Sequence, residues 1–180
     1  MAELGAPVPL PLDRRAALRR LARGAGVAAP ILALFEGTAE ALPRSESTDL
    51  AVLAASIALE HQAIAVYDFG LKRKLFPPGL RGYAVEFHGD HLGHRDTQIA
   101  ITEERGARPP ASRAEYRFAP MRNGDELIRQ ALEVEIAAES AYLALISQIR
   151  SKDYLLSAAF ILVDEVRHMT VWRRVLGLQI

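Results

Sequence analysis

The chain has 180 residues, of which half are apolar, and its 22 acidic residues balance its 22 basic ones. This length suffices for one domain with a sizeable core, and the balanced charge gives no field that would attract nucleic acid or an acidic surface. Cysteine is absent, which excludes disulfides and thiolate ligands. Few segments combine β-branched residues with period-two alternation, so we expect an all-α protein.

Residues 1–45 differ from the rest and are interpreted as a twin-arginine signal or an N-terminal arm. Arginine pairs at 14–15 and 19–20 precede an apolar stretch over 24–35 and the small-x-small sequence Ala39-Glu-Ala41. A basic region, an apolar region and a cleavage site in this order are typical of export signals. The apolar stretch is too short for a stable membrane span. A functional signal would make the protein periplasmic; a packed arm would leave it cytoplasmic.

Residues 46–180 are predicted to form a four-helix bundle, which begins with two helices. Candidate N-caps for the first helix are Ser47, Thr48 and Asp49. Gly70 and the basic residues 72–74 suit its C-terminal end. A Pro-Pro-Gly sequence at 77–79 then separates it from a second helix over about 80–105.

The second half of the bundle is predicted to contain the other two helices. Residues 107–124 contain several prolines and are too long for a tight turn, so we interpret them as a crossover. A third helix is expected over about 125–149. A short turn at 151–153 leads into the fourth helix, which makes the last two helices antiparallel neighbours.

Each predicted helix carries one inward seam of residues spaced three and four apart. The seams are Leu50, Leu53, Ile57, Glu60, Ile64, Tyr67; Ala84, Phe87, His91, His94, Gln98, Ile101; Ile128, Ala131, Glu135, Ala138, Tyr142, Leu145, Ile149; and Ala158, Ile161, Glu165, His168, Trp172, Val175. Six ionisable residues interrupt them: Glu60, His91, His94, Glu135, Glu165 and His168. A buried unpaired carboxylate costs several kcal/mol or becomes neutral. Three carboxylates and three histidines on inward seams therefore indicate a shared partner.

The same pattern occurs in both halves of the chain. Glu60 and Glu135 each precede a tyrosine by seven residues, and we expect Tyr67 and Tyr142 to be core aromatics with hydrogen-bonded hydroxyls. The pair His91-x-x-His94 follows the first glutamate, and Glu165-x-x-His168 follows the second. The sequence therefore predicts a duplicated two-helix unit.

A pair of divalent metal ions is the partner that fits these residues. Four-helix bundles hold di-iron or di-manganese centres with single glutamates on two helices and Glu-x-x-His pairs on the other two. Residues three apart share a helix face, so one helix supplies two ligands. We expect two divalent ions, with iron first and manganese or zinc as alternatives, and we expect Arg167 and Asp96 to orient the ligands.

Three runs carry a family resemblance: His91-Leu-Gly-His94-Arg-Asp96, Gly106-Ala-Arg-Pro-Pro110 and Tyr116-Arg-Phe-Ala-Pro120. They resemble a mostly uncharacterised bacterial ferritin-like domain family within the ferritin and rubrerythrin superfamily. The resemblance covers about residues 48–176. It implies a ferritin-like four-helix bundle, with two helical hairpins joined by a long crossover, and a dimetal-carboxylate centre. It does not fix an activity.

His91 departs from the superfamily pattern, in which the second helix usually carries Glu-x-x-His. A set of three glutamates and three histidines lacks one negative charge, which weakens the expected affinity for hard cations and favours iron, zinc or copper. Asp90 is an alternative ligand, because it lies 30 residues after Glu60 as Glu165 lies 30 after Glu135. The seam places position 91 inward, so we favour His91 and keep Asp90 as a replacement or as a residue that orients a ligand.

Two functions fit these observations. The first is a dimetal oxidase or ferroxidase-like protein whose partners are metal ions and oxygen or peroxide. The alternative is a non-catalytic ferritin-like scaffold with a metal-free polar core. A substrate oxygenase would need a pocket leading to the metals, which the sequence does not reveal. The segment after Trp172 is too short for the fifth helix of ferritin cages, so we expect a monomer or homodimer.

Overall fold

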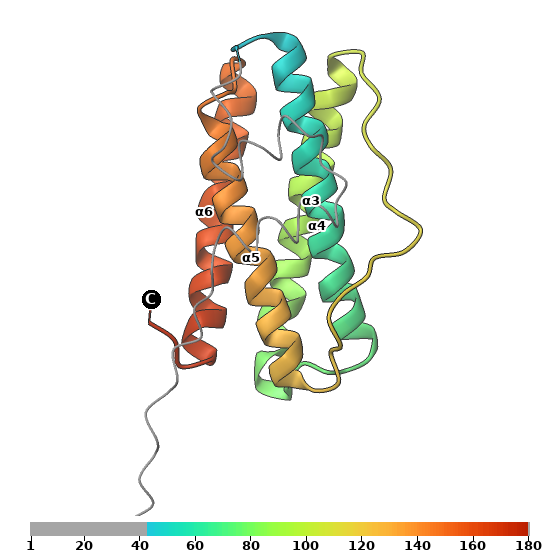
Figure 1. The fold of residues 1–180 in the computed structure, drawn as a ribbon, viewed down its shortest axis with the longest axis vertical. Helices are drawn as coiled ribbons and strands as arrows, with labels where there is room; N and C mark the ends of the chain where they lie inside the picture. The colour runs from blue at the N-terminus through green and yellow to red at the C-terminus, as the bar shows by residue number, and fades with distance from the viewer. Residues whose placement is uncertain (1–42, 180) are drawn as a thin grey trace, which may run out of the picture.

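The computed structural model describes residues 43–179, which form a bundle of four long helices (Figure 1). The elements are α3 (Glu46–Lys72), η1 (Pro78–Leu80), α4 (Arg81–Glu104), α5 (Gly124–Ile146) and α6 (Lys152–Val175). Helices α3 and α4 pack as one hairpin and α5 and α6 as the other. The all-α fold predicted from the sequence is confirmed. The predicted signal or arm lies almost entirely outside the described residues.

The helix boundaries follow from side-chain caps. Helix α3 starts earlier than predicted, because the hydroxyl of Ser45 accepts a hydrogen bond from the backbone N–H of Thr48. Asn123 caps α5 and Ser151 caps α6 in the same way. Asp49, an expected cap, instead accepts hydrogen bonds from the backbone N–H groups at 150 and 151. It thereby ties the start of α3 to the α5–α6 turn.

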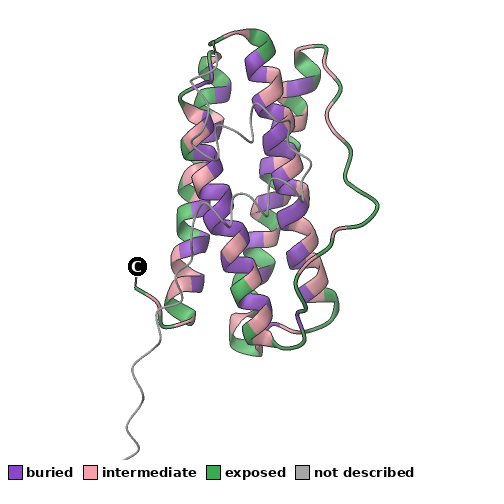
Figure 2. Cartoon of the chain, viewed as in Figure 1, coloured by how far each residue is buried: buried purple, intermediate pink, exposed green. Residues whose placement is uncertain are grey.

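The predicted seams line the core of the bundle, as the burial pattern shows (Figure 2). Leu50, Ile64 and Ile101 are half-buried and Val175 is exposed, while the other seam residues are buried. On α4, most of the buried side chains are polar. Its buried side chains are those of Ala84, Phe87, His91, His94, Gln98 and Thr102.

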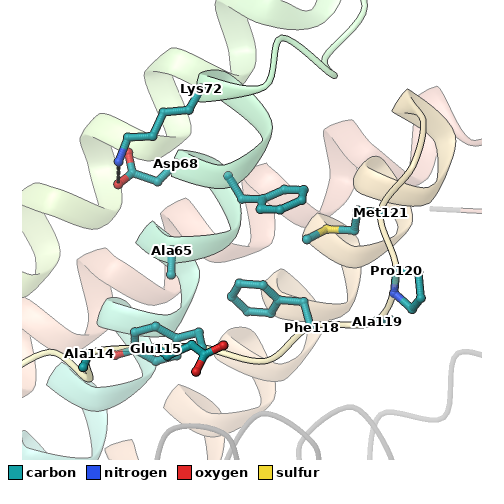
Figure 3. Close-up of a pocket in the computed structure, with 11 residues that line it drawn as sticks. Ala65, Asp68, Lys72, Ala114, Glu115, Phe118, Ala119, Pro120 and Met121 are labelled. Atoms are coloured by element: carbon teal, nitrogen blue, oxygen red, sulfur yellow. Dashed lines mark hydrogen bonds and ion pairs between the residues drawn. The ribbon is translucent and has the colours of Figure 1, made fainter.

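The crossover between the hairpins runs as an extended segment along the outside of α3 (Figure 1). The rings of Tyr116 and Phe118 stack there at 6.3 Å. A cavity of about 530 Å³ lies between the crossover and α3, and Phe118 and Met121 help to line it (Figure 3). None of the six ionisable seam residues borders this cavity.

Within residues 43–179, α3 is the one helix long and apolar enough to cross a membrane by length and composition. Of its most apolar 18-residue window, 67% is buried inside the bundle. The core helix of a four-helix bundle has this character without any membrane contact.

Candidate metal centre

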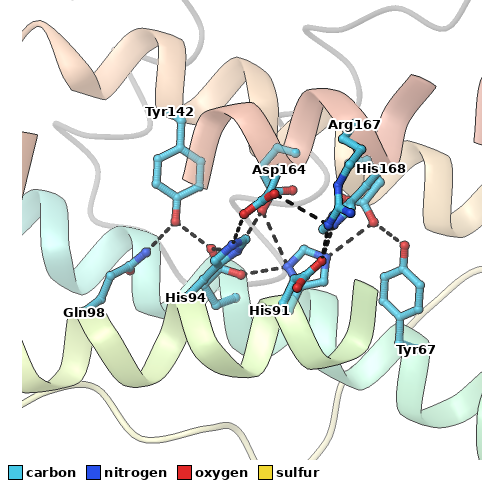
Figure 4. A network of polar contacts seen from close by, with 12 residues as sticks. Tyr67, His91, His94, Gln98, Tyr142, Asp164, Arg167 and His168 are labelled. Atoms are coloured by element: carbon cyan, nitrogen blue, oxygen red, sulfur yellow. Dashed lines mark hydrogen bonds and ion pairs between the residues drawn. The ribbon is translucent and has the colours of Figure 1, made fainter. Parts of the chain in front are cut away.

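The structure brings all six ionisable seam residues together halfway along the bundle (Figure 4). Helix α3 contributes Glu60, α4 contributes His91 and His94, α5 contributes Glu135, and α6 contributes Glu165 and His168. The side chain of His94 is 10% exposed, and those of the other five are at most 2% exposed. Each helix thus delivers one or two ionisable groups to a dry interior.

These residues form two groups that could each hold a metal ion. One group is Glu60, His91, His94 and Glu165; the other is His91, Glu135, Glu165 and His168. In each group the four ligand atoms lie within 4.8 Å of one another. His91 and Glu165 belong to both groups, as expected for two neighbouring sites with shared side chains.

His91 lies between the two groups and directs one ring nitrogen to each. Its Nδ1 is 2.8 Å from an oxygen of Glu60, and its Nε2 is 3.4 Å from an oxygen of Glu135. Asp90 is not in the core: its side chain is 29% exposed, and its Oδ2 lies 3.0 Å from Nε2 of His168. The structure therefore places His91 where a ligand would lie and Asp90 beside a ligand.

The outer nitrogens of the other two histidines face carboxylates on the opposite helix. Nε2 of His168 faces Asp90, and Nε2 of His94 lies 3.3 Å from Asp164. A carboxylate on the outer nitrogen fixes the ring orientation and leaves Nδ1 to bind a metal, which is the usual arrangement around ligating histidines. Nδ1 of both rings points to the interior, 3.3 Å from Glu165 for His94 and 3.4 Å from Glu135 for His168.

Sequence reasoning found one of the residues around the centre, missed another and was wrong about a third. Arg167 holds Asp90 through a 2.5 Å bond, as a residue that orients the ligands. The side chain of Asp96 is 63% exposed and pairs with its neighbour Arg95, so it does not orient a ligand as expected. Asp164 was missed, although it follows Asp90 by the same 74 residues that separate His94 from His168.

Each seam tyrosine crosses from its own hairpin to a glutamate of the other hairpin. Tyr67 on α3 donates to Glu135 on α5 and accepts a 2.7 Å bond from the indole N–H of Trp172. Tyr142 donates to Glu60 at 2.6 Å and accepts a 2.5 Å bond from the Gln98 amide. The expected hydrogen-bonded hydroxyls are present, and they fix both glutamates.

Burial and neighbouring charges shift the pKa values of five of the six residues. Burial acts against ionisation, but the adjacent carboxylates raise the pKa of His91 well above its usual value and raise that of His168. Burial likewise opposes ionisation of Glu60 and Glu135, yet neighbouring histidines bring the pKa of each carboxyl below its usual value. Burial, reinforced by these carboxylates, raises the pKa of Glu165 well above its usual range. These directions favour the neutral form of the Glu165 carboxyl and the pairing of His91 and His168 with the carboxylates of Glu60 and Glu135.

The hydrogen bonding of the core is nevertheless incomplete. Among the described residues, eight buried side-chain polar atoms lack a hydrogen-bond partner, and five of these belong to the candidate centre. They are Nδ1 of His94, Nδ1 of His168, Oε2 of Glu135, and both carboxyl oxygens of Glu165. Since a buried polar atom without a partner costs about 1–3 kcal/mol, this cluster fits metal ions, which would coordinate all five atoms.

Comparison with known proteins agrees with this architecture. Residues 48–178 match a family described as a ferritin-like domain. A crystal structure of a conserved hypothetical protein from Mycobacterium tuberculosis is similar, with a TM-score of 0.68 and 26% sequence identity, over 73% of this chain and 98% of that chain. No curated protein matches the sequence. The family resemblance inferred from the sequence is confirmed, and these relatives assign no reaction.

Proposed function

The chain belongs to the ferritin-like domain family, and on this premise we propose that it binds two divalent metal ions between its helices and reacts with oxygen or peroxide. The observation that carries the proposal is the set of five buried nitrogen and oxygen atoms that lack a hydrogen-bond partner and face one another between the helices. All five belong to residue types that coordinate iron, manganese or zinc. Redox-active ions held by carboxylates and imidazoles would supply the electrons for reduction of a small oxidant.

The two ions would have separate and shared ligands. Glu60 and His94 would hold one ion, and Glu135 and His168 the other, with His91 and Glu165 between them. Iron is the first candidate, because three histidines and three glutamates make a mixed nitrogen and oxygen set. Asp90 and Asp164 would hold the imidazoles in orientation, and the closed core would exclude bulk water from the ions.

The test is the metal content of the freshly purified protein and of Glu165→Gln. Glu165 belongs to both groups, so the amide variant should lose most of the metal per protomer while keeping its size and shape. The matched control is Glu139→Gln, which changes another buried carboxyl on α5 that belongs to neither group. Equal metal content in wild type and Glu165→Gln, or an absence of metal in both after growth with iron, would overturn the proposal.

A second candidate function is a non-catalytic scaffold with a metal-free polar core. The position of His91 favours it, since one imidazolium there bonds to Glu60 and faces Glu135. A metal-filled protein should lose thermal stability when a chelator removes the ions, by mass action. A scaffold should keep its Tm under the same treatment, measured by circular dichroism with and without chelator.

A further inference from the structure

The two sides of the candidate centre between α4 and α6 differ. The side at His168 is covered by side chains and is called the closed flank, and the side at His94 is called the open flank. On the closed flank, Arg167 of α6 reaches across to α4 and bonds Glu86 at 2.6 Å and Asp90 at 2.5 Å. The ring of Phe87 stacks on His168 with 4.0 Å between the centroids. His168 is consequently fully buried on this flank.

The repeat-equivalent residues on the other flank cannot make these contacts. Counting back 74 residues from Arg167 gives Gly93, and counting forward 74 from Glu86 and Phe87 gives Phe160 and Ile161. Gly93 has no side chain to reach α6, and a Cβ built on it would meet nothing within 4 Å. The residues that form ion pairs between the helices on the closed flank thus correspond in the other repeat to a glycine and an apolar pair.

A cleft of about 420 Å³ lies at this open flank between α4 and α6. Its lining includes His94, the candidate ligand with the most exposed side chain, at 10%. Leu156, Phe160 and Ile161 of α6 form the apolar part of its lining. The volume is within the range of small-molecule sites, and the cleft borders the candidate centre at His94.

We propose that this cleft binds a small aromatic molecule that carries a hydroxyl group. The proposal names a substrate class for the metal centre and so rests on the proposed function. The side chain of Phe160 is presented at the cleft with 66% of the residue exposed, and it offers an aromatic face for ring stacking. A ligand ring that covers an apolar side chain of this kind removes apolar surface from water, which favours binding.

The polar groups of the cleft favour a ligand that carries a hydroxyl group. The carboxylate of Asp164 is 39% exposed, accepts hydrogen bonds and lies beside His94. Asp153 adds a second carboxyl to the lining, so an anionic ligand would be repelled. A neutral hydroxyl that donates to the carboxylate of Asp164 fits both conditions, since a hydrogen bond to a charged group is stronger than one between neutral groups.

The test is fluorescence titration of the metal-free protein with 2-naphthol and with naphthalene, which lacks the hydroxyl. Wild type should bind 2-naphthol saturably and about tenfold more tightly than naphthalene. Gly93→Arg adds a long side chain next to His94, which lines the cleft, at a position where a Cβ has room, and arginine is a better helix former than glycine. This variant should bind 2-naphthol at least about tenfold more weakly.

The matched control is Gly89→Arg, because Gly89 is one turn away on the same helix, is exposed, and also has nothing within 4 Å of a built Cβ. It should bind 2-naphthol as wild type does. Phe160→Ser, at an exposed position, should weaken binding as well and covers the case in which Gly93→Arg does not fold. Equal binding by wild type and the folded cleft variants, or no preference for the hydroxyl, would overturn the proposal.

Metal content separates this inference from the proposed function. Naphthol binding by a chain that never takes up metal would support the cleft and refute the metal centre. Normal metal content without any saturable naphthol binding would do the reverse. Gly93→Arg should keep the wild-type metal content, because Gly93 is in neither ligand group.

Discussion

His91 is the residue at which the duplicated centre is not symmetric. The repeat places Glu165 at the equivalent position, where a carboxylate is shared by both groups. An imidazole keeps its two nitrogens on opposite edges of a rigid ring, and here they face Glu60 and Glu135. A carboxylate carries a negative charge to two cations, whereas a neutral imidazole carries none, so His91 lowers the charge complementarity of the centre.

Replacing His91 with glutamate should therefore strengthen binding of a hard cation. We expect His91→Glu to bind Mn²⁺ about tenfold more tightly than wild type, since one added carboxylate favours oxygen-preferring ions. The metal-free variant should lose about 3–5 kcal/mol of unfolding free energy, because the imidazolium that pairs with buried carboxylates is gone. Manganese titration followed by electron paramagnetic resonance measures the first quantity, and urea unfolding the second.

His61→Glu provides the control for this prediction, since His61 is a half-buried histidine on α3 that belongs to neither ligand group. Its manganese affinity should match wild type. Weaker manganese binding by His91→Glu than by His61→Glu would show that the histidine is a better ligand for the site than a carboxylate, against the charge argument.

At the scale of elements, the two hairpins are joined through the tyrosines. Tyr142 of α5 donates to Glu60 of α3 and accepts from Gln98 of α4, so one hydroxyl connects three helices. Tyr67 and Trp172 repeat the arrangement on the other side. These bonds fix the height of α3 relative to α5, and the carboxylates of both helices face the same interior point as a result.

Removing one of these hydroxyls should destabilise the bundle. Tyr142→Phe leaves the Gln98 amide and a Glu60 oxygen without their partner, which costs about 1–3 kcal/mol in unfolding free energy. Tyr83→Phe, at a residue 46% exposed on α4, should change it by less than about 0.5 kcal/mol. Urea unfolding of the metal-free proteins measures both, and a loss of the same size in both variants would contradict the role assigned to the Tyr142 hydroxyl.

Periodicity predicted the four helices and their inward seams, because three- and four-residue spacing is a property of each helix alone. It did not predict that α3 begins at Glu46, since Ser45, Ser47, Thr48 and Asp49 are all competent caps and tertiary contacts decide among them. Asp164 was missed because it lies off the seam. Its place opposite His94 depends on the relative height of α4 and α6, which the sequence of one helix does not contain.

The open cleft shows the same limit at a larger scale. The sequence assigned no part in a cleft to Gly93, Phe160 or Ile161, and their difference from Arg167, Glu86 and Phe87 is evident only when the two repeats are aligned on the contacts of the structure. The repeat itself was visible in the sequence from the paired Glu, Tyr and His positions. What could not be read was which flank closes, because that depends on contacts between α4 and α6.

At the scale of the whole molecule, stability and metal binding should respond to pH in opposite directions. The pKa values of His91 and His168 are raised in the folded, metal-free protein, so above about pH 6.5 the fold holds protons that the unfolded chain has lost. Glu165, whose pKa is also raised, adds to this excess of bound protons at pH values above the usual pKa of a glutamate. The stabilisation is complete below the unfolded pKa values and is lost as pH rises through the folded ones.

The metal-free protein should thus lose Tm as pH rises above about 6.5, whereas the gain in Tm on adding Fe²⁺ or Mn²⁺ without oxygen should grow over the same range. The ions must displace the protons of His91, His168 and Glu165, so proton release favours binding at higher pH. The lowered pKa values of Glu60 and Glu135 stabilise the fold above the usual pKa of a glutamate. This stabilisation is lost only in acid, as pH falls through the folded pKa values. Calorimetry of both forms at each pH tests this, and parallel pH profiles would mean that the metal does not bind where these protons are held.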